Sequence, residues 1–130
     1  MFDLKTKILV VDDMATMRKL VMRTCKNIGF TEFVEAADGS LAWEALGNNP
    51  GIGLIISDWN MPNCTGLDFL KRVRADARFK HLPFMLVTAE AEKGQIVDAI
   101  KSGCSGYVIK PFTDESLRGK LEEAHARLSK

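Results

Sequence analysis

The sequence has little of what would mark a membrane, secreted or nucleic-acid-binding protein. Its 18 basic and 17 acidic residues nearly cancel to a formal net charge of +1, so charge favours neither nucleic acid nor an anionic membrane surface. Its apolar runs are far shorter than a membrane span. The segment 1–5 has an early acidic residue and no signal-peptide core. We therefore expect a cytoplasmic protein that binds neither nucleic acid nor membrane.

Cysteine is also scarce, with only Cys25, Cys64 and Cys104. Their odd number and wide spacing suit neither a disulfide framework nor a zinc site, so we interpret them as free thiols in a reducing compartment. The 130 residues are 46% hydrophobic and 27% charged, an ordinary globular composition. We expect one domain, residues 1–130, large enough to fold without a metal or disulfide.

Five apolar, β-prone runs alternate with five segments of helical periodicity. The expected strands are 7–11, 32–36, 54–57, 84–88 and 107–109. The apolar positions that predict the helices are, in chain order, Met17, Leu20, Val21, Cys25 and Ile28; Leu41, Ala42, Ala45 and Leu46; Leu67, Leu70 and Val73; Ile96, Val97 and Ile100; and Leu117, Leu121, Ala124 and Leu128. This alternation predicts an α/β fold with right-handed crossovers and a parallel sheet. Among doubly wound folds we expect the flavodoxin-like strand order 2-1-3-4-5.

Several residues predict where elements end. Gly29 is the expected C-cap of the first helix, and Thr65, followed three residues later by Asp68, the N-cap of the third. A turn after the third strand is predicted by Asn60, Pro62, Asn63 and Gly66. Gly119 should cost the last helix about 1 kcal/mol relative to alanine, and the sequence offers no reason for it.

Polar residues follow four of the strands. They are Asp12 and Asp13 after the first, Asp58 after the third, Thr88 at the end of the fourth and Lys110 after the fifth. Taken singly, each is an ordinary loop or surface residue. Because the carboxyl ends of parallel strands share one edge, and open α/β sheets bind ligands there, we expect these groups to converge.

Three converging carboxylates resist joint ionisation unless a cation is present. Oxygen ligands of high negative charge suit Mg²⁺. Metal, lysine and a hydroxyl donor together are what phosphoryl transfer needs. A carboxylate nucleophile, for which Asp58 is the candidate, would then form an aspartyl phosphate.

Three stretches carry a resemblance that covers essentially the whole chain. They are Ser57-Asp58-Trp59-Asn60-Met61-Pro62, Val87-Thr88-Ala89-Glu90-Ala91 and Gly106-Tyr107-Val108-Ile109-Lys110-Pro111-Phe112. With Val10-Val11-Asp12-Asp13 and Thr16-Met17-Arg18, they resemble the receiver domain of bacterial two-component response regulators, and within it the CheY-type chemotaxis regulators. The motifs are specific together and weak apart.

The resemblance implies a role for each site residue. Asp58 would be the phosphoacceptor. Asp13 and Asp58 would bind Mg²⁺ by side chain, Asn60 by its backbone carbonyl, and Asp12 through water. Thr88 and Lys110 would contact the phosphoryl group. Tyr107 would be the aromatic switch coupled to Thr88, and the Lys110–Pro111 bond would be cis.

It also implies partners and a function. A CheA-like histidine kinase would donate the phosphoryl group, and the activated protein would bind the flagellar motor switch. The binding face, on the fourth helix, fifth strand and fifth helix, would include Lys93, Ile96, Tyr107, Ile109 and Lys120. We expect a monomeric switch with no output domain, acting on its own phosphorylation and not as an enzyme on other substrates. Whether a separate phosphatase exists stays open.

Two departures from the family stand out. Cys64-Thr65-Gly66 replaces a typical Met-Asp-Gly, which bears on Mg²⁺ affinity and phosphoryl lifetime. Glu123 replaces a lysine used in kinase docking.

Other functions remain as alternatives. A phosphate sink, or a stand-alone receiver in another pathway, would share every site residue. A phosphatase with an aspartate nucleophile after the first strand would need a second acid where Met14 stands. A flavin carrier would need a phosphate-binding loop after the first strand. The loop there has two acidic residues, Asp12 and Asp13, and no glycine, which disfavours phosphate binding.

Overall fold

The fold is an alternation of strands and helices, as the sequence predicts. The computed structural model describes residues 2–61, 64–89 and 93–128, with only the backbone for 93–95. The strands are β1 (Lys7–Val11), β2 (Glu32–Ala36), β3 (Ile52–Asp58), β4 (Phe84–Thr88) and β5 (Gly106–Ile109). The helices are α1 (Ala15–Ile28), α2 (Gly39–Asn48), α3 (Gly66–Ala75), α4 (Lys93–Lys101) and α5 (Asp114–Leu128).

The strands form one parallel sheet in the order β2-β1-β3-β4-β5. This confirms the flavodoxin-like prediction. β3 is longer than expected, because Ile52 still pairs with Lys7 of β1 and Asp58 with Val87 of β4. The added length makes Asp58 the last residue of the strand, which fixes its backbone.

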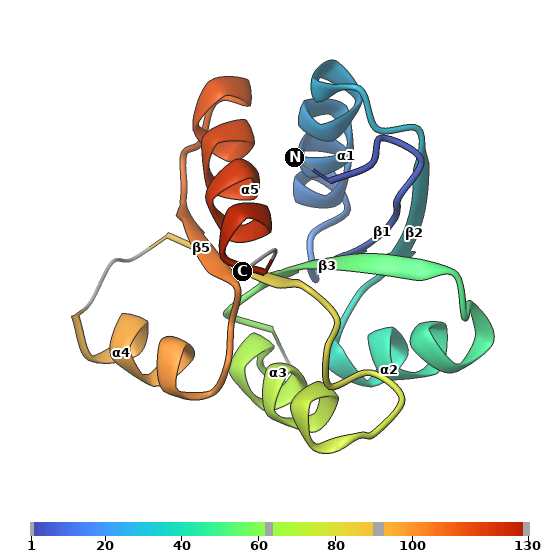
Figure 1. Cartoon of the computed structure of the whole chain (residues 1–130), viewed down its shortest axis with the longest axis vertical. Helices are drawn as coiled ribbons and strands as arrows, with labels where there is room; N and C mark the ends of the chain where they lie inside the picture. Colours follow the sequence, from blue (N-terminus) through green and yellow to red (C-terminus); the bar gives the residue numbers. More distant parts are fainter. Residues whose placement is uncertain (1, 62–63, 90–92, 129–130) are drawn as a thin grey trace.

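Helices cover both faces of the sheet (Figure 1). One apolar cluster contains residues of α1 and α5, such as Val21 and Leu121, and the other contains residues of α2, α3 and α4, such as Leu46, Phe69 and Ala99. Strands covered on both faces need apolar residues throughout. The central strands accordingly appear in the sequence as continuous apolar runs.

The predicted caps of α1 and α3 are present. Gly29 has φ of 130°, and its N–H donates to the carbonyls of Cys25 and Lys26. The Thr65 hydroxyl accepts from the N–H of Asp68 at 3.1 Å. Of the residues predicted to form the turn after β3, Pro62 and Asn63 lie outside the described residues, and Gly66 begins α3.

Some apolar positions that predicted the helices do not face the core. Leu20, Val97, Ile100 and Leu128 are 42–55% exposed, whereas Ala99 is the fully buried residue of α4. Periodicity identified the apolar side of each helix, but neighbouring elements leave part of that side uncovered. No helix within the described ranges is long and apolar enough to cross a membrane.

Candidate functional site

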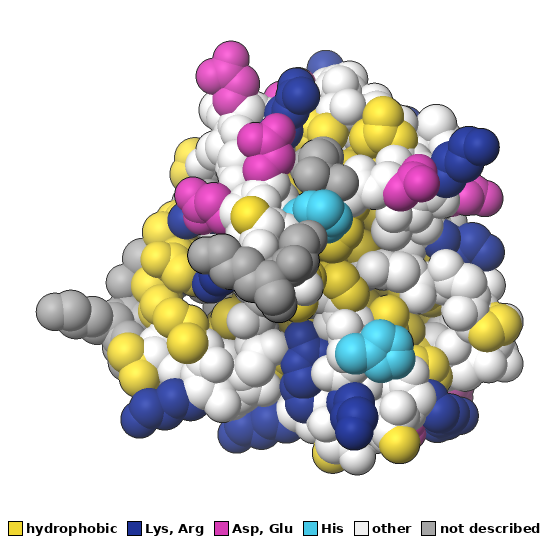
Figure 2. All heavy atoms as spheres, in the orientation of Figure 1, with side chains coloured by type: hydrophobic (Ala, Val, Ile, Leu, Met, Phe, Trp, Pro, Cys, Tyr) yellow, Lys and Arg dark blue, Asp and Glu magenta, His cyan; other side chains and the backbone are white. Residues whose placement is uncertain are grey.

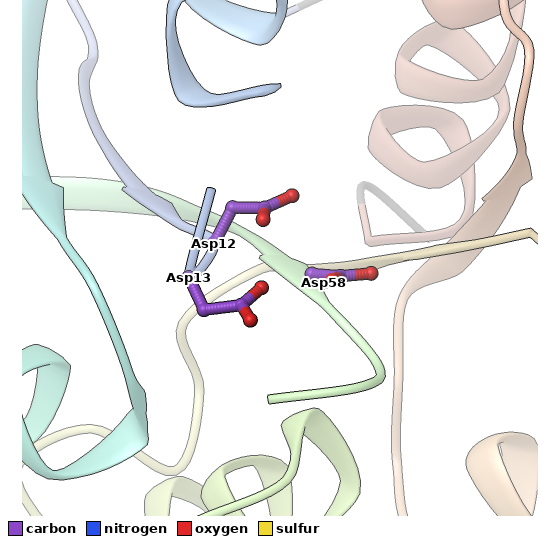
Figure 3. Close-up of side chains that lie close together, drawn as sticks. All are labelled: Asp12, Asp13 and Asp58. Carbon is purple, nitrogen blue, oxygen red and sulfur yellow. The ribbon is translucent and has the colours of Figure 1, made fainter. Parts of the chain in front are cut away.

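Three aspartates come together at the carboxyl-terminal edge of the sheet. Asp12 and Asp13 directly follow β1, and Asp58 is the last residue of the adjacent β3. One carboxylate oxygen of each lies within 4.8 Å of the other two. Figure 3 shows the Asp12 and Asp13 side chains extending from the end of β1 toward the side where Asp58 lies. This confirms the convergence expected from the sequence.

The backbone N–H and the backbone carbonyl of Asp12 both form hydrogen bonds. Its N–H continues the sheet by donating to the carbonyl of Ala36 at 3.1 Å. Its carbonyl accepts from Nη1 of Arg18 at 2.6 Å. Arg18, whose Nε also donates to Glu35 at 3.1 Å, thereby anchors the start of the acidic loop.

Burial and repulsion oppose ionisation of Asp12. Asp12 and Asp58 are only 3% and 8% exposed, while Asp13 is exposed. Burial raises the pKa of Asp12 above its ordinary value, and the Asp58 charge raises it further, although the Met14 N–H and Lys110 partly offset this. The site therefore favours the approach of positive charge.

Lys110 supplies one positive charge from the other side of the site. Its Nζ lies 3.2 Å from Oδ1 of Asp58 and 3.5 Å from Oδ2 of Asp12. The backbone N–H of Lys110 donates to the carbonyl of Thr88 at 2.8 Å. Thr88 is buried at the end of β4, so both residues come to the edge where the aspartates meet. The Lys110–Pro111 bond is cis, as the resemblance predicted.

The Asp58 carboxylate also bonds to the backbone that follows it. Its Oδ1 accepts from the N–H of Trp59 at 2.9 Å. Asn60 lies two residues beyond Asp58 and is exposed. A cation bridging the aspartates would therefore meet a segment whose position relative to Asp58 is fixed by a hydrogen bond.

Residues of the predicted partner face lie on α4, β5 and α5, which follow one another along one side of Figure 1. Ile96 and Tyr107 are half-buried and Ile109 is 42% exposed. Nζ of Lys120 lies 4.9 Å from the centroid of the Tyr107 ring. The side chain of Lys93 lies outside the described residues.

Two residues that matter to the site were not identified from the sequence. Arg18 holds the Asp12 carbonyl, whereas in the sequence it belongs only to a stretch that carries the resemblance and has no role assigned to it. Gly66 packs on Asp58, because a Cβ at Gly66 would collide with the carbonyl oxygen of Asp58. A turn glycine in sequence does not reveal such a contact. Cys64, in the loop whose sequence differs from the family pattern, fills the space beside Gly39, so that a Cβ at Gly39 would collide with it.

The donor set fits a divalent metal. All three groups offer carboxylate oxygens, which hard cations prefer to nitrogen or sulfur. Burial, and after it the nearby Asp58 charge, raise the pKa of Asp12, so negative charge at this residue is unfavourable. A bound divalent cation would remove that cost. The residues that would hold it are Asp12, Asp13 and Asp58.

Comparison with known sequences places these features in a wider group. The profile of the response regulator receiver domain matches residues 8–122. The chain is 46% identical to chemotaxis protein CheY of Pseudomonas aeruginosa, over 95% of this chain and 98% of the relative. It is 43% identical to chemotaxis protein CheY-3 of Vibrio cholerae, over 94% and 93% respectively.

Solved structures give the same picture. The Vibrio cholerae chemotaxis protein CheY4 superposes with a TM-score of 0.84 at 33% identity, over 92% of this chain and 98% of that one. Similarity therefore extends over sequence, strand order and almost the full length of these relatives.

Proposed function

The chain belongs to the response regulator receiver domain family, and from this we propose that it is a chemotaxis signalling switch phosphorylated on Asp58. The observation that carries the proposal is the position of Asp58. It is a buried carboxylate that closes β3, with Lys110 at 3.2 Å and two further aspartates within 4.8 Å.

The proposal assigns Mg²⁺ to the acidic cluster. Asp13 and Asp58 would bind the ion by side chain, Asn60 by its carbonyl, and Asp12 through water. When bound, the ion would supply positive charge for the oxygens of the transferring phosphoryl group. Lys110 would supply a second positive charge, and the Thr88 hydroxyl a hydrogen-bond donor to the same group.

Asp58 itself would be the nucleophile. Its Oδ1 already accepts from Trp59 N–H and Lys110 Nζ, so we assign the attack to Oδ2. The new Oδ2–P bond would form as the P–N bond of a phosphohistidine breaks, and the histidine nitrogen would leave with the bonding electron pair. A CheA-like histidine kinase is the proposed donor.

The phosphorylated state would be transmitted to the α4–β5–α5 face. This face would include the predicted residues Lys93, Ile96, Tyr107, Ile109 and Lys120. To these we add Val97 and Ile100 of α4, which together with Ile109 are 42–55% exposed. Phosphorylation would shift Thr88, and Tyr107 would respond. Uncovered apolar side chains beside a half-buried tyrosine suit a protein contact. The proposed partner is the flagellar motor switch.

The proposal further includes a single-domain, monomeric protein that works in the cytoplasm. It acts on its own phosphorylation and does not turn over an external substrate. A phosphate sink, or a receiver serving another pathway, is the alternative, because it would use the same Asp58 site. Binding of phosphorylated protein to a motor-switch peptide separates these functions, since neither alternative requires it.

Tryptophan fluorescence tests the switch directly, because Trp59 adjoins Asp58 and its backbone N–H donates to the Asp58 carboxylate. Mg²⁺ followed by acetyl phosphate should change the emission of the wild type. Asp58→Asn should respond to the metal weakly and to the donor not at all. Trp59→Phe measures the background from Trp43. A wild type that binds Mg²⁺ but shows no response to phosphodonor would contradict the switch function.

A further inference from the structure

A large cavity lies at the amino-terminal edge of the sheet, opposite the aspartates. Its volume is about 670 Å³, within the range of about 300–1,000 Å³ common for small-molecule sites. Its walls come from the segments before β4 and β5, the end of α5 and Phe2 near the start of the chain. None of these residues belongs to the Asp58 site.

The cavity concentrates positive charge in a chain whose charges nearly balance overall. Five of its lining residues are basic or histidine: Arg74, Lys80, His81, His125 and Arg127. No aspartate or glutamate lines it among the described residues. Both histidines of the chain are here. Figure 2 shows both histidine side chains, in cyan, on one face of the molecule.

Arg74 lines the cavity, and its guanidinium group donates hydrogen bonds to backbone carbonyls of the protein. Its Nε donates to the carbonyl of Gly103 at 2.9 Å, and its Nη1 donates to those of Lys80 and Leu82 at 3.1 and 2.7 Å. These bonds tie the segment before β4 to the segment before β5. The two walls therefore have a fixed separation.

Three other cationic or ionisable groups have no acidic partner among the residues that the structure describes. No ion pair within the described parts of the chain includes Lys80, His81 or Arg127. All three are exposed at the cavity. Lysine and arginine so placed are suited to phosphate oxygens, arginine by paired hydrogen bonds.

Most of the remaining lining is apolar, and one apolar ring packs on a histidine. The rings of Phe2 and His125 pack edge to face with centroids 5.0 Å apart. Pro83, Ala124 and Leu128 extend this surface. Inorganic phosphate would leave most of the apolar lining uncovered. A purely apolar ligand would bury the charged groups without giving them hydrogen bonds or ion pairs.

We propose that this cavity is a second ligand site, which binds a nucleotide-sized organic phosphate. Lys80, His81 and Arg127 face the phosphate groups, and the Phe2–His125 pair lies beside the organic body. The site is independent of phosphorylation at Asp58, because the two occupy opposite edges of the sheet.

Calorimetric titration with ATP tests the proposal on the full chain. EDTA is present throughout, so that ATP does not reach the aspartates as a metal complex. Adenosine and tripolyphosphate are titrated separately to measure the organic body and the phosphates alone. The site variant is Lys80→Ala/Arg127→Ala. The matched control, Lys19→Ala/Arg23→Ala, removes the same charges from exposed positions on α1.

The expected result is ATP binding that exceeds that of either fragment by at least about tenfold. The site variant should bind ATP about tenfold more weakly, as loss of charged hydrogen bonds predicts, and the control within about twofold of wild type. Backbone amide NMR signals of Gly103, Cys104 and Ser105 should shift with ATP. Absent ATP binding, equal losses in both variants, tripolyphosphate binding as tight as ATP, or shifts confined to the Asp58 edge would each overturn the proposal.

Discussion

At the scale of single residues, the site holds groups whose burial costs folding free energy. Asp12 is 3% exposed, and its carboxylate oxygen lies within 4.8 Å of those of Asp13 and Asp58. Lys110 offsets only part of the repulsion, because burial and Asp58 still raise the pKa of Asp12. Such a cluster is retained for binding rather than for stability.

Asp12→Asn should therefore stabilise the metal-free protein at pH 7, by about 0.5–2 kcal/mol. A raised pKa in the folded state means that stability falls as pH rises through the interval between the unfolded and folded pKa values. Above that interval Asp12 is ionised, and its burial then lowers the free energy of unfolding most. Asparagine keeps an oxygen that can accept from Met14 N–H, the bond Asp12 makes at 2.9 Å.

Urea unfolding in EDTA measures this effect. The gain should shrink as the pH is lowered through the raised folded-state pKa of Asp12, because the side chain then takes up a proton. Asp98→Asn is the control, because Asp98 is an exposed carboxylate on α4. A loss of stability in Asp12→Asn at pH 7 would contradict the account of repulsion.

Arg18 provides a second test at this scale. Its Nη1 holds the Asp12 carbonyl at 2.6 Å. Arg18→Met should weaken Mg²⁺ binding by about tenfold, the lower end for residues that orient metal ligands. Glu35→Gln is the matched control, because it removes the ion pair with Arg18 but leaves the bond to Asp12. Titration of Mg²⁺ against Trp59 fluorescence measures both, and unchanged affinity in Arg18→Met would refute the anchoring role.

At the scale of helices and strands, the sequence predicted most of the fold. Strands covered on both faces must be apolar throughout, so β1 and β4 were predicted with their observed bounds. The caps of α1 and α3 could also be predicted from the sequence, because Gly29 and Thr65 act through hydrogen bonds to residues close in the chain. The convergence of Asp12, Asp58 and Lys110 followed from parallel strand order alone.

What could not be predicted depends on contacts between distant segments. Val97 and Ile100 have the spacing of a core face, yet they are exposed because no described element covers that side of α4. The contact of Gly66 with the Asp58 carbonyl arises only when α3 packs against β3. The cavity beside Arg74 joins residues from separate loops and α5. None of these leaves a local pattern in the sequence.

Gly119 in α5 now has a structural context. A Cβ built there meets no heavy atom within 4 Å. Gly119→Ala should therefore raise the free energy of unfolding by about 1 kcal/mol, the usual difference between glycine and alanine inside a helix. Thermal or urea unfolding measures the change. Gly66→Ala is the contrasting variant and should destabilise, because its Cβ would collide with the Asp58 backbone. Destabilisation by Gly119→Ala would show that the position has a constraint that its free space does not explain.

At the scale of the whole molecule, a net charge of +1 coexists with an acidic cluster and a basic cavity at opposite edges of one sheet. The carboxyl-terminal edge gathers three aspartates, and the amino-terminal edge gathers basic residues and both histidines. Between them, the α4–β5–α5 face exposes apolar side chains. Each surface suits a different class of ligand: a metal and phosphoryl group, an organic phosphate, and a protein.

The most direct test of the central claim is the intact mass of the protein after incubation with Mg²⁺ and acetyl phosphate. We predict one phosphoryl adduct on the wild type, its absence when EDTA replaces Mg²⁺, and its absence in Asp58→Asn. Asp98→Asn should carry the adduct as the wild type does. A wild type that never gains the adduct, or an Asp58→Asn variant that gains it equally, would contradict the assignment of Asp58 as the phosphoacceptor.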